Sequence, residues 1–135
     1  MDFAGLNYVA IPLAAVAAFL FGALYYGLFG KPWMKAARIE PQQGKTPLTP
    51  FITGFIAELI MAWVLAGVIG HLGVGQVTPL NGIISGAFIW FGFIATTIAT
   101  NQRYQGFGWT LTLIDAGHWL GVALIMGGVI GWLGV

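Results

Sequence analysis

The chain has 135 residues, of which 59% are hydrophobic and only 7% are charged. A typical soluble domain carries about 25% charged residues, so this composition excludes an ordinary water-soluble fold. The formal net charge of +1 comes from too few basic residues for a nucleic-acid surface, and the absence of cysteine excludes disulfides, thiolate nucleophiles and cysteine-ligated metals. We expect an integral membrane protein whose main partner is the lipid bilayer and which binds no nucleic acid.

Four apolar segments are each long enough to cross a bilayer as a helix, which takes roughly 20 residues. They lie at about 8–29, 50–73, 80–101 and 109–133. The uncharged stretch 59–102 is too long for one crossing, and GVGQVTPLNG at 73–82 supplies the turn within it. The sequence therefore predicts an all-α, polytopic fold in which residues 1–135 form a single four-helix transmembrane domain.

The segment ends carry recognisable signals. An acid, Asp2, stands where a secretory signal would have basic residues, so we expect the first apolar segment to be retained as a span. Thr49-Pro50 and Thr78-Pro79 open the second and third spans, each with threonine as the N-cap and proline as the first helical residue.

The basic residues predict the orientation. All five lie between spans one and two or between spans three and four: Lys31, Lys35, Arg38, Lys45 and Arg103. Under the positive-inside rule both of these loops are cytoplasmic and both termini lie outside. Trp33 and Trp109 fall at the inner boundary, as belt aromatics do. We expect a multi-pass protein of the bacterial inner membrane, whose basic stretch after residue 30 either lies on the anionic inner leaflet or acts only as an orientation signal.

Two patterns concern helix packing. GVIGHLGV at 67–74 returns as GVIGWLGV at 128–135. If this is a true repeat, and not chance similarity between glycine-rich helices, two hairpins are related by an axis along the membrane normal. Small residues also recur at intervals of four, which allows close helix contact: Ala14, Ala18 and Gly22; Gly82 and Gly86; Gly117 and Gly121; Gly127 and Gly131. We expect unused small-residue faces to form a homo-oligomer, in the simplest case a parallel dimer.

Ionisable residues are rare inside the spans, and three of them fall in the cytoplasmic halves. With a rise of about 1.5 Å per residue, Glu58 lies about 12 Å from the inner boundary, while Asp115 and His118 lie about 9 and 13 Å from it. Asp115 and His118 are three residues apart and share a helix face. Together with residues that end near the same level, they form the set of candidates for a proton or ligand site: Glu58, Asp115, His118, Tyr25, Tyr26, Thr112 and Asn101.

Two interpretations of this set remain open. A charge at the bilayer centre costs at least about 2.5–3.5 kcal/mol, so these groups are neutral, paired or facing water. The first interpretation is a site that lines a cytoplasm-facing cavity, in a proton- or cation-linked carrier of a small solute or a ligand-binding membrane protein. The alternative is a hydrogen-bonded knot joining span four to span two, in a non-catalytic structural or interaction subunit of a membrane assembly.

Metal and enzyme chemistry find little support. Glu58, Asp115 and His118 follow no recognised metal-ligand spacing, so we expect neither a metal nor a cofactor. Ser85 is the only serine, it lies in the opposite half of the membrane, and neither Gly-x-Ser-x-Gly nor His-Glu-x-x-His occurs. We therefore assign no catalytic residue.

The stretch LFGALYYGLFGKPWMKA at 20–36 resembles a bacterial family of small four-span membrane proteins of unknown function, DUF1761. The resemblance rests on Gly22, Tyr25-Tyr26, Phe29 and Trp33, and it extends in length and span count over nearly the whole chain. It implies the same four-span architecture and supplies no activity and no site residue.

Overall fold

The computed structural model describes residues 5–41 and 44–135, and within these ranges every regular element is a helix. The elements are α1 (Ala10–Ala37), α2 (Thr49–Gly70), α3 (Pro79–Ile89), the π-helix η1 (Trp90–Ala95), α4 (Thr96–Tyr104) and α5 (Trp109–Leu133). Since η1 joins α3 to α4 without a break, the described residues contain four helical segments long and apolar enough to cross a membrane. The all-α, four-span prediction is confirmed, and the chain is a multi-pass membrane protein.

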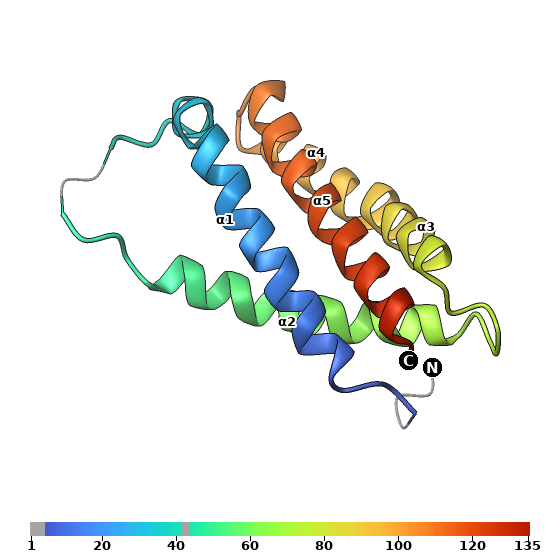
Figure 1. Cartoon of the computed structure of the whole chain (residues 1–135). Coiled ribbons are helices and arrows are strands. Elements are labelled where there is room, and N and C mark those ends of the chain that lie inside the picture. The colour runs from blue at the N-terminus through green and yellow to red at the C-terminus, as the bar shows by residue number, and fades with distance from the viewer. Residues whose placement is uncertain (1–4, 42–43) are drawn as a thin grey trace.

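The bundle is built around α5. This helix packs along α1 on one side and along α3 on the other, while α2 crosses obliquely and packs mainly on α1 (Figure 1). At one end of the bundle Asn7 Nδ2 donates to the Leu133 carbonyl over 3.2 Å, which ties the start of α1 to the end of α5. At the other end Arg38 Nη2 donates to the Gly106 carbonyl over 2.7 Å. The basic residues lie in two segments, the connections from α1 to α2 and from α4 to α5 together with the adjoining ends of α1 and α4. We call these segments the basic loops, and they meet at one end of the bundle.

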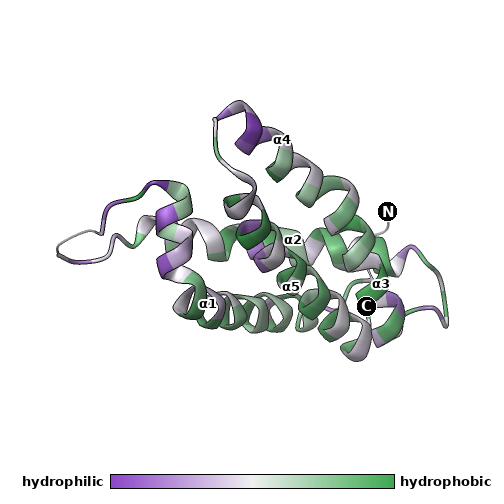
Figure 2. Cartoon of the chain, turned by 90° about the horizontal axis from the view of Figure 1, so that it is seen from above, coloured by the Kyte–Doolittle hydropathy of each residue, from purple (hydrophilic) through white to green (hydrophobic). Residues whose placement is uncertain are grey.

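Hydropathy follows this arrangement. The most hydrophilic segments are loops and helix ends, and apolar residues cover the rest of the helices (Figure 2). On α1, Leu20, Leu24 and Leu28 lie four residues apart and are each more than 60% exposed. On the opposite side of α1, Ala14 and Ala18 are fully buried in the core. An apolar outer face of this kind is suited to lipid and not to water.

α3 and α5 make contact through glycines. A Cβ atom on Gly82 would fall on the backbone carbonyl of Gly127. One on Gly86 would fall on the Ala123 carbonyl, and one on Gly131 would fall on the backbone of the Thr78–Pro79 turn. The expected close approach through small residues therefore occurs within the chain, where these residues have no room for any side chain.

α1 is longer than the sequence predicted. We expected the span to end near residue 29, but the helix continues to Ala37 with Pro32 inside it. It ends at Arg38, which adopts a left-handed conformation with φ of 57°. There the backbone N–H of Ile39 donates to the Met34 carbonyl over 2.9 Å, as in a normal helix C-cap. Lys31 and Lys35 consequently lie on a helix and not in a loop.

The predicted helix starts are correct for one span and displaced for another. Thr78 caps α3, because its hydroxyl accepts the Asn81 N–H over 3.2 Å and Pro79 follows as the first helical residue. In contrast, Thr49 is already helical, the cap position is Leu48, and no side chain caps this end.

The third span contains a π-helical segment that the sequence did not reveal. Within and after η1, the hydroxyls of Thr96 and Thr97 donate to the carbonyls of Gly92 and Phe93 over 2.9 and 2.5 Å. Such back-bonding to carbonyls four residues earlier competes with the normal helix ladder and commonly distorts it. At the start of the segment Trp90 Nε1 donates to the Ala116 carbonyl of α5 over 2.7 Å.

The repeated octapeptides occupy related places in the core. Ile69 of α2 and Ile130 of α5 are equivalent in the repeat, and both are fully buried in the same cluster. The preceding equivalent pair, Ala62 and Ala123, is buried as well. Equivalent residues in and just before the two copies are therefore buried, while residues 71–74 and 132–133 are exposed, and the symmetry between the hairpins stays a prediction.

We expect Gly82→Ala to lower the free energy of unfolding by about 1–3 kcal/mol, because the added methyl group meets backbone that cannot rotate away. Thermal unfolding of the protein in lipid nanodiscs measures this effect. Gly92→Ala is the matched control, since a Cβ there has no neighbour within 4 Å. It should be neutral or slightly stabilising, and equal melting of the two variants would contradict the glycine contact.

Candidate ligand pocket

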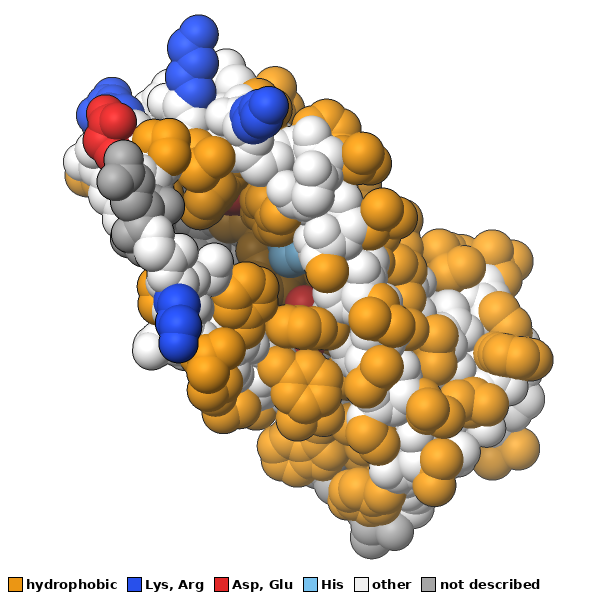
Figure 3. All heavy atoms as spheres, turned by 60° about the vertical axis from the view of Figure 1, so that its left-hand side comes forward, with side chains coloured by type: hydrophobic (Ala, Val, Ile, Leu, Met, Phe, Trp, Pro, Cys, Tyr) orange, Lys and Arg blue, Asp and Glu red, His pale blue; other side chains and the backbone are white. Residues whose placement is uncertain are grey.

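A pocket of about 610 Å³ lies between the C-terminal half of α1 and the N-terminal half of α2, and α5 closes it from behind. Its lining residues are Phe19, Gly22, Ala23, Tyr26, Gly27, Gly30, Trp33, Met34, Pro50, Phe51, Gly54, Glu58, His118 and Trp119. In Figure 3 it is a hollow in which a histidine and an acidic side chain are visible, with Lys and Arg side chains near its rim. The pocket therefore faces the end of the bundle that carries the basic loops.

Glycines make room for this pocket. An added Cβ would meet no atom within 4 Å at Gly27, Gly30 or Gly54, so these positions leave open space beside the helix backbones. Gly22 has a different role, because a Cβ there would lie 2.8 Å from Nε2 of His118. This glycine allows the imidazole to lie directly against α1.

Glu58 is the acidic group of the pocket. It is only 3% exposed, and its Oε2 atom is buried without a hydrogen-bond partner among the described residues. No lysine or arginine is among the described lining residues. A buried carboxylate oxygen without a partner is costly, and native structures retain few of them. Gly54, one helical turn earlier, also lines the pocket, and a Cβ there would meet no atom within 4 Å.

His118 is the second polar group. It is 7% exposed, and its Nδ1 atom is also buried without a hydrogen-bond partner among the described residues. Its ring lies among four aromatic rings at centroid distances between 4.8 and 6.2 Å: Tyr26, Trp119, Tyr25 and Phe21. The imidazole is thus fixed by packing, while one nitrogen remains without a partner.

Asp115 lies behind the pocket wall. Its Oδ1 atom accepts hydrogen bonds from Tyr26 Oη over 2.8 Å and from Trp33 Nε1 over 2.9 Å, and both donors come from α1. Its Oδ2 atom accepts from Gln102 Nε2 of α4 over 2.9 Å. Since Tyr26 and Trp33 line the pocket, Asp115 positions two of its aromatic walls without lining it.

A series of polar contacts links this carboxylate to Arg103, and we call it the polar chain. Gln102 Oε1 accepts from Thr112 Oγ1 over 2.7 Å, and Thr112 Oγ1 accepts from Arg103 Nη2. Arg103 also donates to the Gly108 carbonyl over 3.0 Å and stacks on the Trp109 ring. Every bond donates in the direction of Asp115, so the polar chain runs from a guanidinium to a carboxylate and its members polarise one another.

The candidates from the sequence thus fall into three groups. Glu58, His118 and Tyr26 line the pocket; Asp115 and Thr112 belong to the polar chain; and two others belong to neither. Tyr25 donates to the Ile114 carbonyl over 2.7 Å, and the side chain of Asn101 is exposed. The described residues contain no group of three acidic, histidine or cysteine side chains suited to a metal.

The hydrogen-bonded knot lies elsewhere than the sequence suggested. It joins span four to spans one and three, and among the described residues the Glu58 carboxylate of span two is not part of this network. The sequence analysis missed Gln102 and placed Trp33 only in the aromatic belt. One signal was present: Gln102 lies four residues before Gly106 and Asp115 seven residues after Gly108, so both are close to the turn of an antiparallel helix hairpin.

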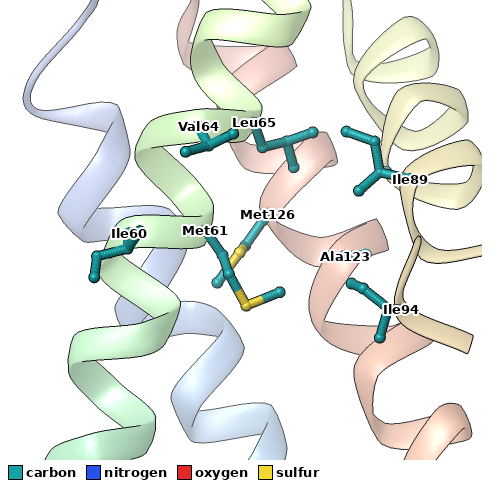
Figure 4. A pocket seen from close by; sticks show the side chains of 9 residues that line it. Ile60, Met61, Val64, Leu65, Ile89, Ile94, Ala123 and Met126 are labelled. Atoms are coloured by element: carbon teal, nitrogen blue, oxygen red, sulfur yellow. The ribbon is translucent and has the colours of Figure 1, made fainter. Parts of the chain in front are cut away.

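A second pocket lies between α2, α3, η1 and α5, and it has a different character. Its volume is about 220 Å³, and Figure 4 shows aliphatic and methionine side chains pointing into it. The lining residues are Ile60, Met61, Val64, Leu65, Gly86, Ile89, Ile94, Ala123 and Met126. None of these side chains can donate or accept a strong hydrogen bond, so a polar solute would find no partner there.

The comparisons with known proteins give one match. Residues 9–131 match a family model described as "Protein of unknown function (DUF1761)". No curated protein and no solved structure matches the chain significantly. The family match spans all four membrane helices and confirms the resemblance found in the first hairpin, and its description assigns no substrate and no site residue.

We expect Asp115→Leu to destabilise the bundle by at least about 3 kcal/mol, since it leaves Tyr26, Trp33 and Gln102 without their acceptor and each such donor costs about 1–3 kcal/mol. Asp115→Asn should stay within about 1 kcal/mol of the wild type, because its amide oxygen still accepts from α1 and the Gln102 amide can turn over. Thermal unfolding in nanodiscs distinguishes the two variants.

The neighbouring change Asn101→Leu serves as the control, because this side chain is exposed and outside the network. It should alter stability by no more than about 0.5 kcal/mol. Similar melting of Asp115→Leu and Asn101→Leu would mean that the carboxylate does not hold the helices together.

Proposed function

Because the chain belongs to the DUF1761 family, whose description assigns no function, we propose a function from the pocket itself: this membrane protein binds a small solute between α1 and α2. Glu58 and His118 form the polar end of the site, and aromatic side chains form its walls. The observation that carries the proposal is that two nearly fully buried ionisable side chains line one pocket, each with a polar atom that lacks a hydrogen-bond partner.

The energetics favour an occupant. A buried polar atom left without a partner costs about 1–3 kcal/mol, and more when the group is charged. Two such atoms in one pocket are explained if a bound solute supplies the missing hydrogen bonds. The volume of about 610 Å³ lies within the range of roughly 300–1,000 Å³ that is typical of small-molecule sites.

If the bound solute is also moved across the membrane, the protein is a carrier. The pocket lies within the membrane-spanning helices and opens toward the basic loops, and carriers commonly bind their substrates inside the bilayer. We propose that a small solute enters from the cytoplasmic side and that proton or cation binding at Glu58 is linked to its movement.

A structural or interaction subunit is the second candidate. The observation that favours it is the complete pairing of Asp115, which gives this residue a packing role. The glycines that suggested contacts with other chains, such as Gly82 and Gly127, are used between α3 and α5. The parallel homodimer therefore stays a prediction without support from these positions.

We propose an inner-membrane location with both termini outside. The contact between the two basic loops supports this orientation, because it gathers the positive charge at one end: besides its hydrogen bond to Gly106, the Arg38 guanidinium lies 5.1 Å from the centre of the Phe107 ring. The positive-inside rule then assigns that end to the cytoplasm.

The binding proposal predicts that Gly54→Leu abolishes solute binding, since leucine would extend into the open space in front of Glu58. The assay is a thermal-shift screen of small amphipathic solutes on the protein in nanodiscs. At least one solute should raise the melting temperature of the wild type and not that of Gly54→Leu. Gly92→Leu adds the same side chain outside the pocket and should keep the response. If every active solute stabilises Gly54→Leu as well, the site is wrong.

The topology is tested with single cysteines, which the chain lacks naturally. We chose the exposed positions Thr46, between α1 and α2, and Val74, between α2 and α3. In intact cells a membrane-impermeant maleimide should label Val74→Cys at once and Thr46→Cys only after the membrane is opened. The reverse pattern would invert the orientation, and labelling of both from outside would refute the topology.

A further inference from the structure

We infer that the pocket selects a protonated amine with an apolar body, whose ammonium group donates hydrogen bonds to Glu58 Oε2 and His118 Nδ1. This inference rests on the proposed function and adds the chemical class of the solute. It starts from two buried polar atoms without partners among the described residues: both can accept a hydrogen bond, and both belong to side chains that line the same pocket.

The charge of the lining residues favours a cationic solute. Glu58 is the only Asp, Glu, Lys or Arg among the described lining residues. The nearest basic group along the polar chain, Arg103, is already bonded to Thr112 and Gly108 behind the wall. An anionic solute would therefore place a second negative charge beside a buried carboxylate, with no lysine or arginine among the described lining residues to balance it. An ammonium group instead neutralises Glu58 and forms a charge-assisted hydrogen bond.

His118 does not itself balance Glu58. Its Nδ1 atom and the Glu58 Oε2 atom are both without partners, so no hydrogen bond joins these two atoms. A neutral imidazole has one nitrogen that accepts a hydrogen bond. An ammonium carries up to three N–H groups and can donate to both acceptors at once, which a hydroxyl group with its single hydrogen cannot do.

The walls suit the same class of solute. Tyr26 and Trp33 donate their O–H and N–H groups to Asp115, so their own donors are occupied and their rings remain for the solute. Donation to a carboxylate increases the electron density of the donor's ring, which strengthens its attraction for a cation. Phe51 and Trp119 add further aromatic surface for an apolar body.

Three compounds with one apolar body test this inference: 4-phenylbutylamine, 4-phenylbutan-1-ol and 4-phenylbutanoic acid. Their binding to the wild type is measured by calorimetry in phosphatidylcholine nanodiscs, with empty nanodiscs subtracted. We expect the amine to bind about tenfold or more tightly than either of the others, as a charge-assisted hydrogen bond warrants. Glu58→Gln keeps the shape of the side chain and should remove this preference, because it weakens binding of the amine far more than binding of the alcohol.

The outcomes separate the two proposals. If the alcohol or the acid binds as tightly as the amine, or if Glu58→Gln leaves amine binding unchanged, the ammonium class is wrong. The pocket itself then still stands if Gly54→Leu abolishes binding of the alcohol. Binding of none of the three, while a solute from the screen remains sensitive to Gly54→Leu, also refutes the ammonium class. Binding of all three that is insensitive to Gly54→Leu refutes the pocket. The ranking on the wild type needs no variant and holds even if Glu58→Gln fails to fold.

Discussion

In a bilayer, apolar side chains gain little by leaving lipid for protein, so close packing and hydrogen bonds must hold the helices of this bundle together. α5 meets this requirement on both sides. Toward α3 its glycines allow backbone to touch backbone, as at Gly127 and Gly82. Toward α1, Gly117 and Gly121 receive the rings of Tyr25 and Phe21. These contacts set the distances between α1, α3 and α5, and the arrangement of the rest of the bundle follows from these distances.

The pocket is a consequence of this asymmetry. α2 crosses the other helices obliquely (Figure 1), and the pocket lies between its N-terminal half and α1. The polar chain stiffens the opposite side of that space, because Asp115 holds Tyr26 and Trp33 of α1 in place. One side of the pocket is therefore fixed by hydrogen bonds, and the other is formed by α2, which carries Glu58.

The sequence predicted the features that depend on one helix at a time. Composition predicted four spans, Thr78 was correctly identified as a cap, and a simple rise per residue placed Glu58 and His118 at a common depth, where they do share a pocket. Features that depend on rotation about a helix axis were not predictable. Asp115 points at α1 and α4 and not at α2, because packing of the glycines sets that rotation. The π-helix was also missed, since the backbone bonds of Thr96 and Thr97 leave no trace in periodicity.

Two hydrogen bonds described above have a common effect on α5. Tyr25 Oη of α1 donates to the carbonyl of Ile114, and Trp90 Nε1 of the third span donates to the carbonyl of Ala116. Successive residues of a helix point about 100° apart. The two hydrogen bonds are accepted two residues apart and come from different neighbouring helices, so together they prevent α5 from rotating about its axis. Asp115 lies between Ile114 and Ala116, and His118 follows less than one helical turn later. The rotation that sets the polar end of the pocket therefore depends on the side chains of Tyr25 and Trp90, whereas residues 114 and 116 contribute only their main-chain carbonyls to these two hydrogen bonds.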